Sequence, residues 1–442
     1  MAISLPDEPA REALLAGRPV LWLNPRLRLG GIQDPALPVR PDQVAQSQAN
    51  WQRLAPLLQA LFPDLAASGG RIRSDLLALQ PKLRQAIGQD GPEFGQIFLK
   101  ADNDLPVAGS IKARGGVYEV FMYAEALARQ HGIITDDIMA LASDAARALF
   151  ARHTIAVGST GNLGLSVGIA ARALGFKAAV HMSLDAKAWK VERLTRLGVE
   201  VVQHQADYTT AVEQARDDAK ADPSIYFVDD ERSQMLFFGY SAAAQELAGQ
   251  LAKAGVTVNA DHPLFVYLPC GIGGAPGGVA YGLKAIFGDA AHCFFVEPVQ
   301  SPCAMVQMMS GRKGLISVYD VGLSNRTEAD GMAVARMSDF VAEVMAPMLS
   351  GIFTVEDDAL FRWLWHAHDA QGIRLEPSAA AGFGGPDALL KTAAGNDYLR
   401  LHGIESRLGQ GTHVIWATGG AFVPEDQFQS FLQRGQALVQ AG

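Results

Sequence analysis

Residues 154–183, TIAVGSTGNLGLSVGIAARALGFKAAVHMS, decide the fold class of this chain. The stretch opens with a short β-branched run at 154–158 and passes through a small, polar turn. It continues with helical spacing up to Gly175 and closes with a second apolar run at 177–183. A strand, a helix and another strand in succession are typical of a βαβ unit, whose two strands run parallel. The sequence therefore predicts an α/β protein.

The same alternation continues on both sides of this stretch. Further helices are expected at 116–132, at 185–198 with Asp185 as the cap, and at 279–288. Further strands are expected at 94–102, 199–205, 263–269, 292–298 and 412–418. Regular alternation of this kind predicts parallel sheets covered by crossover helices.

Composition narrows the class of protein. The chain has 442 residues, of which 49% are hydrophobic and 19% charged, as in ordinary globular proteins. A net charge of −9 argues against nucleic-acid binding, which needs a basic patch. No apolar run approaches a membrane span, and the N-terminus lacks a signal-peptide pattern. Three cysteines argue against a disulfide framework, so we expect a cytoplasmic protein with neither membrane nor nucleic-acid partners.

Residues 269–278, PCGIGGAPGG, form the segment richest in glycine. A predicted strand leads into the glycines, and a predicted helix follows them. Glycines let backbone N–H groups approach an anion, and a helix N-terminus adds unpaired donors, so the segment suits a phosphate. The Lys-Ser or Lys-Thr pair of a nucleotide triphosphate loop is absent. The alternative is a flexible strand-to-helix turn.

Three other segments carry candidate chemistry, and each also has a plain structural interpretation. Residues 158–164, GSTGNLG, offer hydroxyl, amide and backbone donors to a carboxylate, or a simple helix cap. Lys112, among the small residues of GSIKARGG at 109–116, is either a reactive amine or a solvated helix start. Thr418 ends a predicted strand, where its hydroxyl could reach into a cleft.

Taken together, these segments indicate a binding site. Three of the loops follow predicted parallel strands, and ligands of open α/β sheets bind at the carboxyl ends of the strands. A lysine, a phosphate cradle and a carboxylate clamp are the parts needed to hold pyridoxal phosphate and an amino acid.

The motifs SIKARGG, VGSTGNLGLS, PCGIGGAPGG and WATGG resemble those of pyridoxal-phosphate enzymes of the tryptophan-synthase β-like fold, also called fold type II. Within that group the chain is most similar to the bacterial D-serine dehydratase family, over roughly residues 94–424. The resemblance implies two domains, each with a mostly parallel sheet flanked by helices, and an active site in the cleft between them. The implied division is a large cofactor-binding domain at 94–117 and 241–442, a small α/β domain at 118–240, and an N-terminal helical segment, 1–93, packed on the large domain.

The resemblance also implies a role for each candidate residue. Lys112 is expected to join the cofactor aldehyde as a Schiff base, while Asn162 bonds the ring 3-hydroxyl and Thr418 faces the pyridine nitrogen. The phosphate is expected on the backbone N–H groups of Gly271, Ile272, Gly273 and Gly274. The substrate carboxylate is expected at Ser159, Thr160 and Gly161. Glu297, with Cys303, is expected to bind a monovalent cation, K⁺ or Na⁺.

The implied reaction is β-elimination of D-serine, and also of D-threonine, in a monomeric enzyme. The α-proton of a D substrate points away from the lysine when carboxylate and ring sit as in L-specific relatives. Thr160, with Asp230 behind it, is the candidate for removing that proton. An L-serine or L-threonine dehydratase, a β-replacing synthase and a non-catalytic cofactor-binding protein remain as alternatives.

Overall fold

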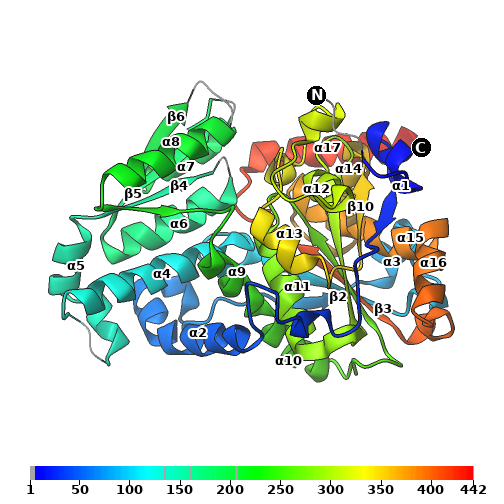
Figure 1. The fold of residues 1–442 in the computed structure, drawn as a ribbon, viewed down its shortest axis with the longest axis horizontal. Coiled ribbons are helices and arrows are strands. Elements are labelled where there is room, and N and C mark those ends of the chain that lie inside the picture. Colours follow the sequence, from blue (N-terminus) through cyan, green and yellow to red (C-terminus); the bar gives the residue numbers. More distant parts are fainter. Residues whose placement is uncertain (1–4, 134–135, 160, 185, 205–207, 442) are drawn as a thin grey trace.

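The computed structural model describes residues 5–133, 136–159, 161–184, 186–204 and 208–441. Two lobes, each built around its own sheet, stand side by side in Figure 1. Most strand pairs in both sheets are parallel, and helices cover the sheets. The predicted α/β class is confirmed. None of the described helices combines the length and the apolar character needed to cross a membrane.

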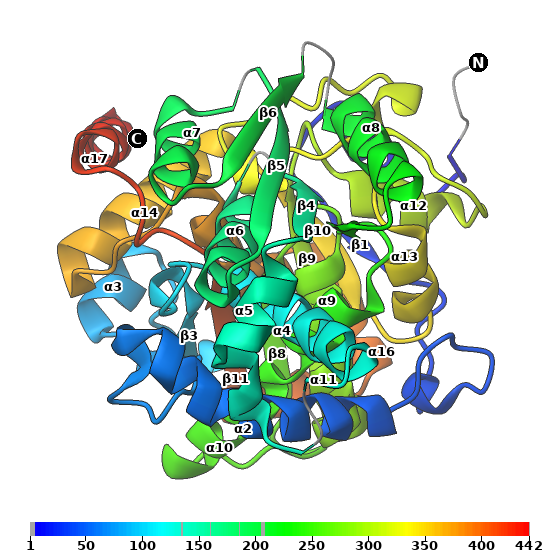
Figure 2. The same cartoon turned by 90° about the vertical axis from the view of Figure 1, so that its left-hand side faces the viewer.

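The smaller lobe contains a sheet of four parallel strands in the order β6-β5-β4-β7. Their bounds are β4 (Thr154–Gly158), β5 (Lys177–Ser183), β6 (Glu200–His204) and β7 (Ile225–Val228). The opening stretch forms β4, α6 (Asn162–Leu174) and β5, and α6 ends at Gly175, which adopts the left-handed conformation with φ 99°. Around the sheet lie α5 (Asp144–Phe150), α7 (Ala188–Arg196) and α8 (Tyr208–Ala221), seen most directly in Figure 2.

The larger lobe contains a seven-stranded sheet in the order β1-β10-β9-β8-β11-β3-β2. Its five inner strands are parallel, and the outermost strands pair antiparallel to their neighbours. The bounds are β1 (Leu21–Leu23), β2 (Leu76–Ala78), β3 (Gln96–Ala101), β8 (Leu264–Pro269), β9 (Ala291–Pro298), β10 (Gly351–Val355) and β11 (Thr412–Ala417). These parallel strands point their carboxyl ends at the same edge of the sheet, where the predicted loops follow.

Residue alternation along the inner strands separates two apolar layers. In β8, Val266 packs into one core, while Phe265 and Tyr267 pack into the other. The first core joins the sheet to α9 (Gln234–Ser241), α10 (Ala243–Lys253), α11 (Gly274–Phe287), α12 (Cys303–Ser310) and α13 (Asp339–Met345). The second covers the other face with α3 (Pro81–Ala86), α14 (Asp357–Gln371), α15 (Gly385–Leu390), α16 (Ala393–Leu401) and α17 (Glu425–Ala441).

The N-terminal segment differs from its expected form. Besides α1 (Ala10–Leu15) and α2 (Asp42–Leu61), it supplies β1 and β2, the two edge strands of the large sheet. Moreover, α2 packs on helix α4 (Lys112–Gln130), where Asn50 Nδ2 donates to Tyr118 Oη at 2.9 Å. The segment is therefore not purely helical. The division of the chain into domains stays a prediction.

Helix α7 begins later than expected. Its first residue is Ala188, and Lys187 stands at the N-cap without a side-chain hydrogen bond. Asp185, the expected cap, lies outside the described residues.

Candidate active site

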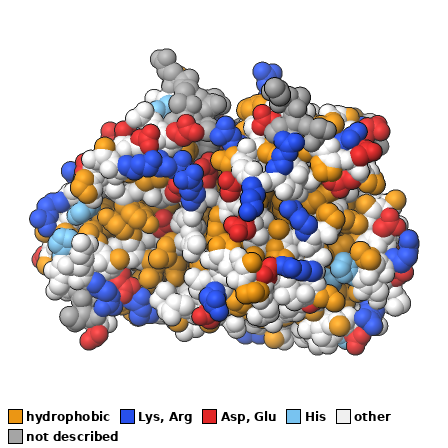
Figure 3. Space-filling view, viewed as in Figure 1, with side chains coloured by type: hydrophobic (Ala, Val, Ile, Leu, Met, Phe, Trp, Pro, Cys, Tyr) orange, Lys and Arg blue, Asp and Glu red, His pale blue; other side chains and the backbone are white. Residues whose placement is uncertain are grey.

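A cavity of about 510 Å³ lies between the lobes. Figure 3 shows the surface hollowed there, with blue and red charged side chains on both flanks. Both lobes contribute to its wall. Among the lining residues are Lys112, Ser159, Gly161, Asn162, Asp230, Gly271, Ile272, Gly273 and Thr418, so the structure brings most of the predicted site residues together. Gly274 is not part of this wall, and Thr160 lies outside the described residues.

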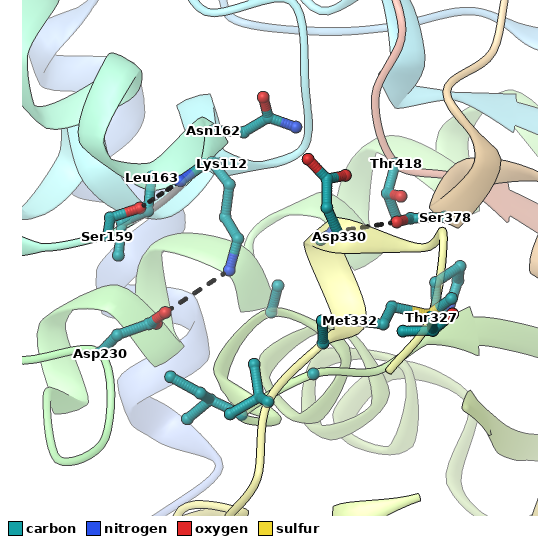
Figure 4. A pocket seen from close by; sticks show the side chains of 18 of the residues that line it. Lys112, Ser159, Asn162, Leu163, Asp230, Thr327, Asp330, Met332, Ser378 and Thr418 are labelled. Carbon is teal, nitrogen blue, oxygen red and sulfur yellow. Dashed lines mark hydrogen bonds and ion pairs between the residues drawn. The ribbon is translucent and has the colours of Figure 1, made fainter. Parts of the chain in front are cut away.

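Lys112 is the first residue of α4, and its side chain points into the cavity in Figure 4. Its Nζ lies 3.8 Å from Asp230 Oδ2 and 5.7 Å from the centre of the Tyr240 ring. Asp230 Oδ1 is buried and has no hydrogen-bond partner among the described residues. Because a buried carboxylate oxygen without a donor is unfavourable, this acceptor is available to a ligand in the cavity.

The small residues beside Lys112 serve helix packing. A Cβ at Gly115 would overlap the phenol of Tyr240 on α9, and one at Gly116 would overlap Ser166 on α6. Ser166 Oγ also donates to the Lys112 carbonyl at 2.8 Å. These glycines bring α9 and α6 close to the start of α4 and so position the lysine. They do not themselves make room beside the amine.

The loop from Gly271 to Gly273 fits a phosphate group. In the part of the chain that the structure describes, the N–H groups of Gly271, Ile272 and Gly273 donate no hydrogen bond, and Ile272 and Gly273 are buried. Gly274 begins α11, so its N–H has no acceptor within the helix either. Gly273 has φ 111°, a conformation that favours glycine and turns the chain into the helix. An anion would satisfy these donors and the positive end of α11.

Two later glycines of the same motif have another purpose. A Cβ at Gly277 would lie 2.6 Å from Val341 Cγ1, and one at Gly278 would overlap the Phe237 carbonyl of α9. The glycine content of 269–278 therefore reflects two needs, anion access at its start and close helix packing at its end.

The second loop presents polar groups from β4 to α6. Ser159 Oγ accepts the Gly161 N–H at 3.1 Å, and Asn162, the first residue of α6, donates from Nδ2 to Glu376 Oε1 at 2.9 Å. Thr418 follows β11, and its carbonyl accepts the Ile111 N–H at 2.8 Å, which ties this strand end to the start of α4. Figure 4 shows Asn162 near Lys112, and Thr418 across the same cavity beside Ser378.

Glu297 lies apart from the cavity wall. Its carboxylate accepts the N–H groups of Ala304 at 2.7 Å and Met305 at 2.9 Å, so it caps the start of α12. Burial raises the pKa of Glu297 to about 8. No cluster of metal-ligating side chains is found among the described residues, and cation binding at Glu297 and Cys303 stays a prediction.

Several polar residues that the sequence does not mark as candidates also line the cavity, and four of them are Lys190, Asp330, Glu376 and Ser378. Burial and the neighbouring Asp330 raise the pKa of Glu376. Ser378 Oγ accepts the Gly331 N–H at 3.1 Å. Three of the four come from segments after residue 300, beyond the recognised loops, and a lysine on a helix gives no local sign that it will be buried. The stretch LEPSAAAG at 375–382, which contains Glu376 and Ser378, is a signal in the sequence that could have pointed to these two residues.

The fold and the site define a two-lobed α/β protein with a lysine amine, a set of free backbone donors for an anion, and an orphaned acceptor in one cavity. Residues 80–398 match the profile of the family described as "Pyridoxal-phosphate dependent enzyme", and the chain belongs to this family. Pyridoxal phosphate carries both a phosphate and an aldehyde that reacts with amines, so the residues present fit this cofactor.

Relatives and a solved structure extend the comparison. A protein of Sinorhizobium medicae named "Probable D-serine dehydratase" is 64% identical over 99% of both chains. One of Acidovorax ebreus with the same name is 53% identical over 98% of this chain and 97% of its own. The structure of diaminopropionate ammonia lyase from Escherichia coli, in complex with D-serine, has a TM-score of 0.71 at 19% identity, covering 96% of this chain and 98% of that one. This last likeness shows the shared fold.

Proposed function

We propose that this chain is a D-serine ammonia-lyase, which converts D-serine to pyruvate and ammonia by β-elimination with pyridoxal phosphate. The observation that carries the proposal is the meeting of Lys112, the donors of 271–273 and the loop at 158–164 in one cavity. The relative named "Probable D-serine dehydratase", identical at 64% of positions over 99% of the chain, supports the same substrate.

The chain's own residues would hold the cofactor at both ends. Lys112 Nζ would bind its aldehyde carbon, and the backbone donors of 271–274 would bind its phosphate. Asn162 would face the ring hydroxyl and Thr418 the pyridine nitrogen. When bound, the cofactor accepts electron density from the substrate Cα. A neutral threonine, unlike a carboxylate, does not keep the pyridine nitrogen protonated, which favours prompt loss of the β-hydroxyl.

The reaction breaks the Cα–H and Cβ–O bonds of D-serine and releases water and an enamine, which water then converts to pyruvate and ammonia. Ser159 and Gly161 would orient the substrate through its carboxylate. We assign removal of the α-proton to the Thr160 hydroxyl, supported by Asp230. The carboxylate of Asp230 also lies beside Lys112, with Oδ2 3.8 Å from Nζ.

Pyruvate release from the purified, cofactor-loaded protein tests the function. We expect D-serine to be the best substrate, D-threonine to react and L-serine to react poorly, if at all. Lys112→Ala should lose the absorbance of the lysine-bound cofactor near the visible–ultraviolet boundary together with turnover. A preference for L-serine or L-threonine, or bound cofactor without any turnover, would contradict the proposal.

Thr160→Ala tests the assignment of the base. The variant should keep the cofactor absorbance and lose turnover by about 100-fold or more, in the usual range for general acid–base groups. Unchanged turnover would remove Thr160 from the mechanism.

Three further properties belong to this proposal. We infer a cytoplasmic enzyme, since Cys270, Cys293 and Cys303 are all buried free thiols, as a reducing compartment permits. A monomer and a K⁺ or Na⁺ ion near Glu297 follow from the family resemblance. Fractionation of cells tests the location, and light scattering of the purified protein tests the oligomeric state. Activity after exchange of K⁺ or Na⁺ for a bulky organic cation tests the cation dependence.

A further inference from the structure

Lys190, on α7 of the smaller lobe, is a buried lysine inside the cavity. It is 2% exposed, although lysines are rarely buried unless paired. Its Nζ donates to Asp330 Oδ2 at 2.7 Å, across the cleft in the larger lobe. Burial alone would lower the pKa of Lys190, but Asp330 and Glu376 outweigh burial and the pKa is raised. The side chain is therefore a charged ammonium group.

The position of Nζ relative to the substrate loop is the second observation. A Cβ built on Gly161 would lie 3.6 Å from Lys190 Nζ, so the ammonium group stands directly beside this loop. An ammonium group has three N–H donors. Within the described ranges, one hydrogen bond of Lys190 Nζ is found, the bond to Asp330. Donors therefore remain for an anion that reaches Gly161.

We propose that Lys190 binds the carboxylate of the amino-acid substrate, together with Ser159 and Gly161. The inference deepens the proposed function and rests on it, because it assumes an amino-acid substrate. The loop supplies neutral donors, whereas Lys190 supplies a full positive charge, and hydrogen bonds between charged groups are the stronger kind. Since Lys190 also bonds Asp330, a carboxylate held at this point is linked to both lobes.

A neighbouring lysine provides a matched control. Lys187 lies one turn earlier and also faces Asp330, with Nζ 3.5 Å from Oδ2. Its side chain is 32% exposed, against 3% for Lys190. Removing Lys187 takes a positive charge from the same aspartate without touching the group beside Gly161. The pair of variants separates loss of a partner for Asp330 from loss of a carboxylate ligand.

The experiment compares D-alanine, which has a carboxylate but no leaving hydroxyl, with D-alaninamide, which has no carboxylate. Binding to the cofactor-loaded enzyme is followed by the change in cofactor absorbance. Lys190→Gln should weaken the binding of D-alanine about 10- to 100-fold, as expected for a lost hydrogen bond to a charged group. The binding of D-alaninamide should weaken less than about 3-fold. Lys187→Gln should change neither ligand by more than about 3-fold.

A double variant tests whether Lys190→Gln weakens binding only because it leaves Asp330 without its partner. In Lys190→Gln/Asp330→Asn neither charge is left unpaired, yet the preference for D-alanine over D-alaninamide should still be lost. Asp330→Asn alone should keep it. Equal weakening of both ligands in Lys190→Gln, recovery of the preference in the double variant, or no preference in the unmodified enzyme would overturn the role of Lys190. Failure of D-serine to yield pyruvate, with the preference intact, would overturn the proposed function instead.

Discussion

Glu119 is a buried acid that the proposed chemistry does not use. It lies on α4, and its carboxylate accepts hydrogen bonds from Tyr226 Oη at 2.9 Å and from Ser233 Oγ. Burial raises the pKa of Glu119 from the usual 4.5 to about 7. In the folded state the group therefore holds its proton over a pH range in which the unfolded chain has lost it.

This shift predicts a pH-dependent stability. The contribution of Glu119 is fully present below pH 4.5 and is lost as the pH rises toward 7. Glu119→Gln imitates the protonated acid, so its unfolding free energy relative to the unmodified protein should rise by about 3 kcal/mol between pH 4.5 and 8. Urea unfolding at several pH values measures this difference in unfolding free energy. Glu192→Gln, at an exposed site, should show no such trend, and the same flat response in Glu119→Gln would contradict the prediction.

At the scale of elements, α11 and α9 pack so closely that two glycines of α11 touch the backbone of α9. A Cβ at Gly278 would overlap the carbonyl of Phe237, and one at Gly282 the carbonyl of Ser241. Because α11 begins at the candidate phosphate loop, this packing also sets where the loop donors lie.

Two glycine-to-alanine changes should therefore have opposite effects on the stability of the protein. Gly249, in the interior of α10, has open space where a Cβ would stand, so Gly249→Ala should stabilise the protein by roughly 0.5–1 kcal/mol. Gly278→Ala should destabilise it by roughly 1–3 kcal/mol through overpacking, and weaken cofactor binding. Chemical denaturation and cofactor titration measure both effects. Stabilisation by both changes would disprove the packing role.

At the scale of the whole molecule, buried charges join segments that are distant in the sequence. Arg114 of α4 donates to both oxygens of Asp102 at 2.8 Å and to Glu246 of α10 at 2.9 Å. Trp416 of β11 also donates to Asp102, and Lys100 of β3 pairs with Glu246. The cluster holds α4, and with it Lys112, against the large sheet.

Removing one charged residue of this cluster should strongly destabilise the protein. Arg114→Met leaves the buried carboxylate of Asp102 and the partly buried one of Glu246 with Lys100 as the remaining cation among the described residues, so the unfolding free energy should fall by about 3–5 kcal/mol. The affinity for the cofactor should fall as well, since Lys112 lies two residues away on the same helix. Arg400→Met, at an exposed ion pair, is the control and should cost less than about 1 kcal/mol. Similar losses in the two variants would show that the buried cluster does not stabilise the fold.

Strands and helices were predictable where the signal is local. Strands β4 and β5 have the bounds expected from their apolar runs, and β8, β9 and β11 differ by one residue at one end. The edge strands β1, β2 and β7 were missed because they have three or four residues. So few residues show no periodicity, and pairing with a neighbouring strand decides their conformation. Strand β10 was not predicted either, although it has five residues like β4.

By itself, the sequence determined the α/β class, the inner strands and the loops that meet at the cavity, because these depend on residues adjacent along the chain. Only the tertiary structure decided which groups complete the site. Lys190 meets Asp330 across 140 residues, and Asn162 meets Glu376 across 214. It also showed that two of the five glycines in 269–278, Gly277 and Gly278, serve packing against α13 and α9. The physical reason is that burial, charge pairing and close helix contact are properties of neighbours in space, which the order of residues alone does not specify.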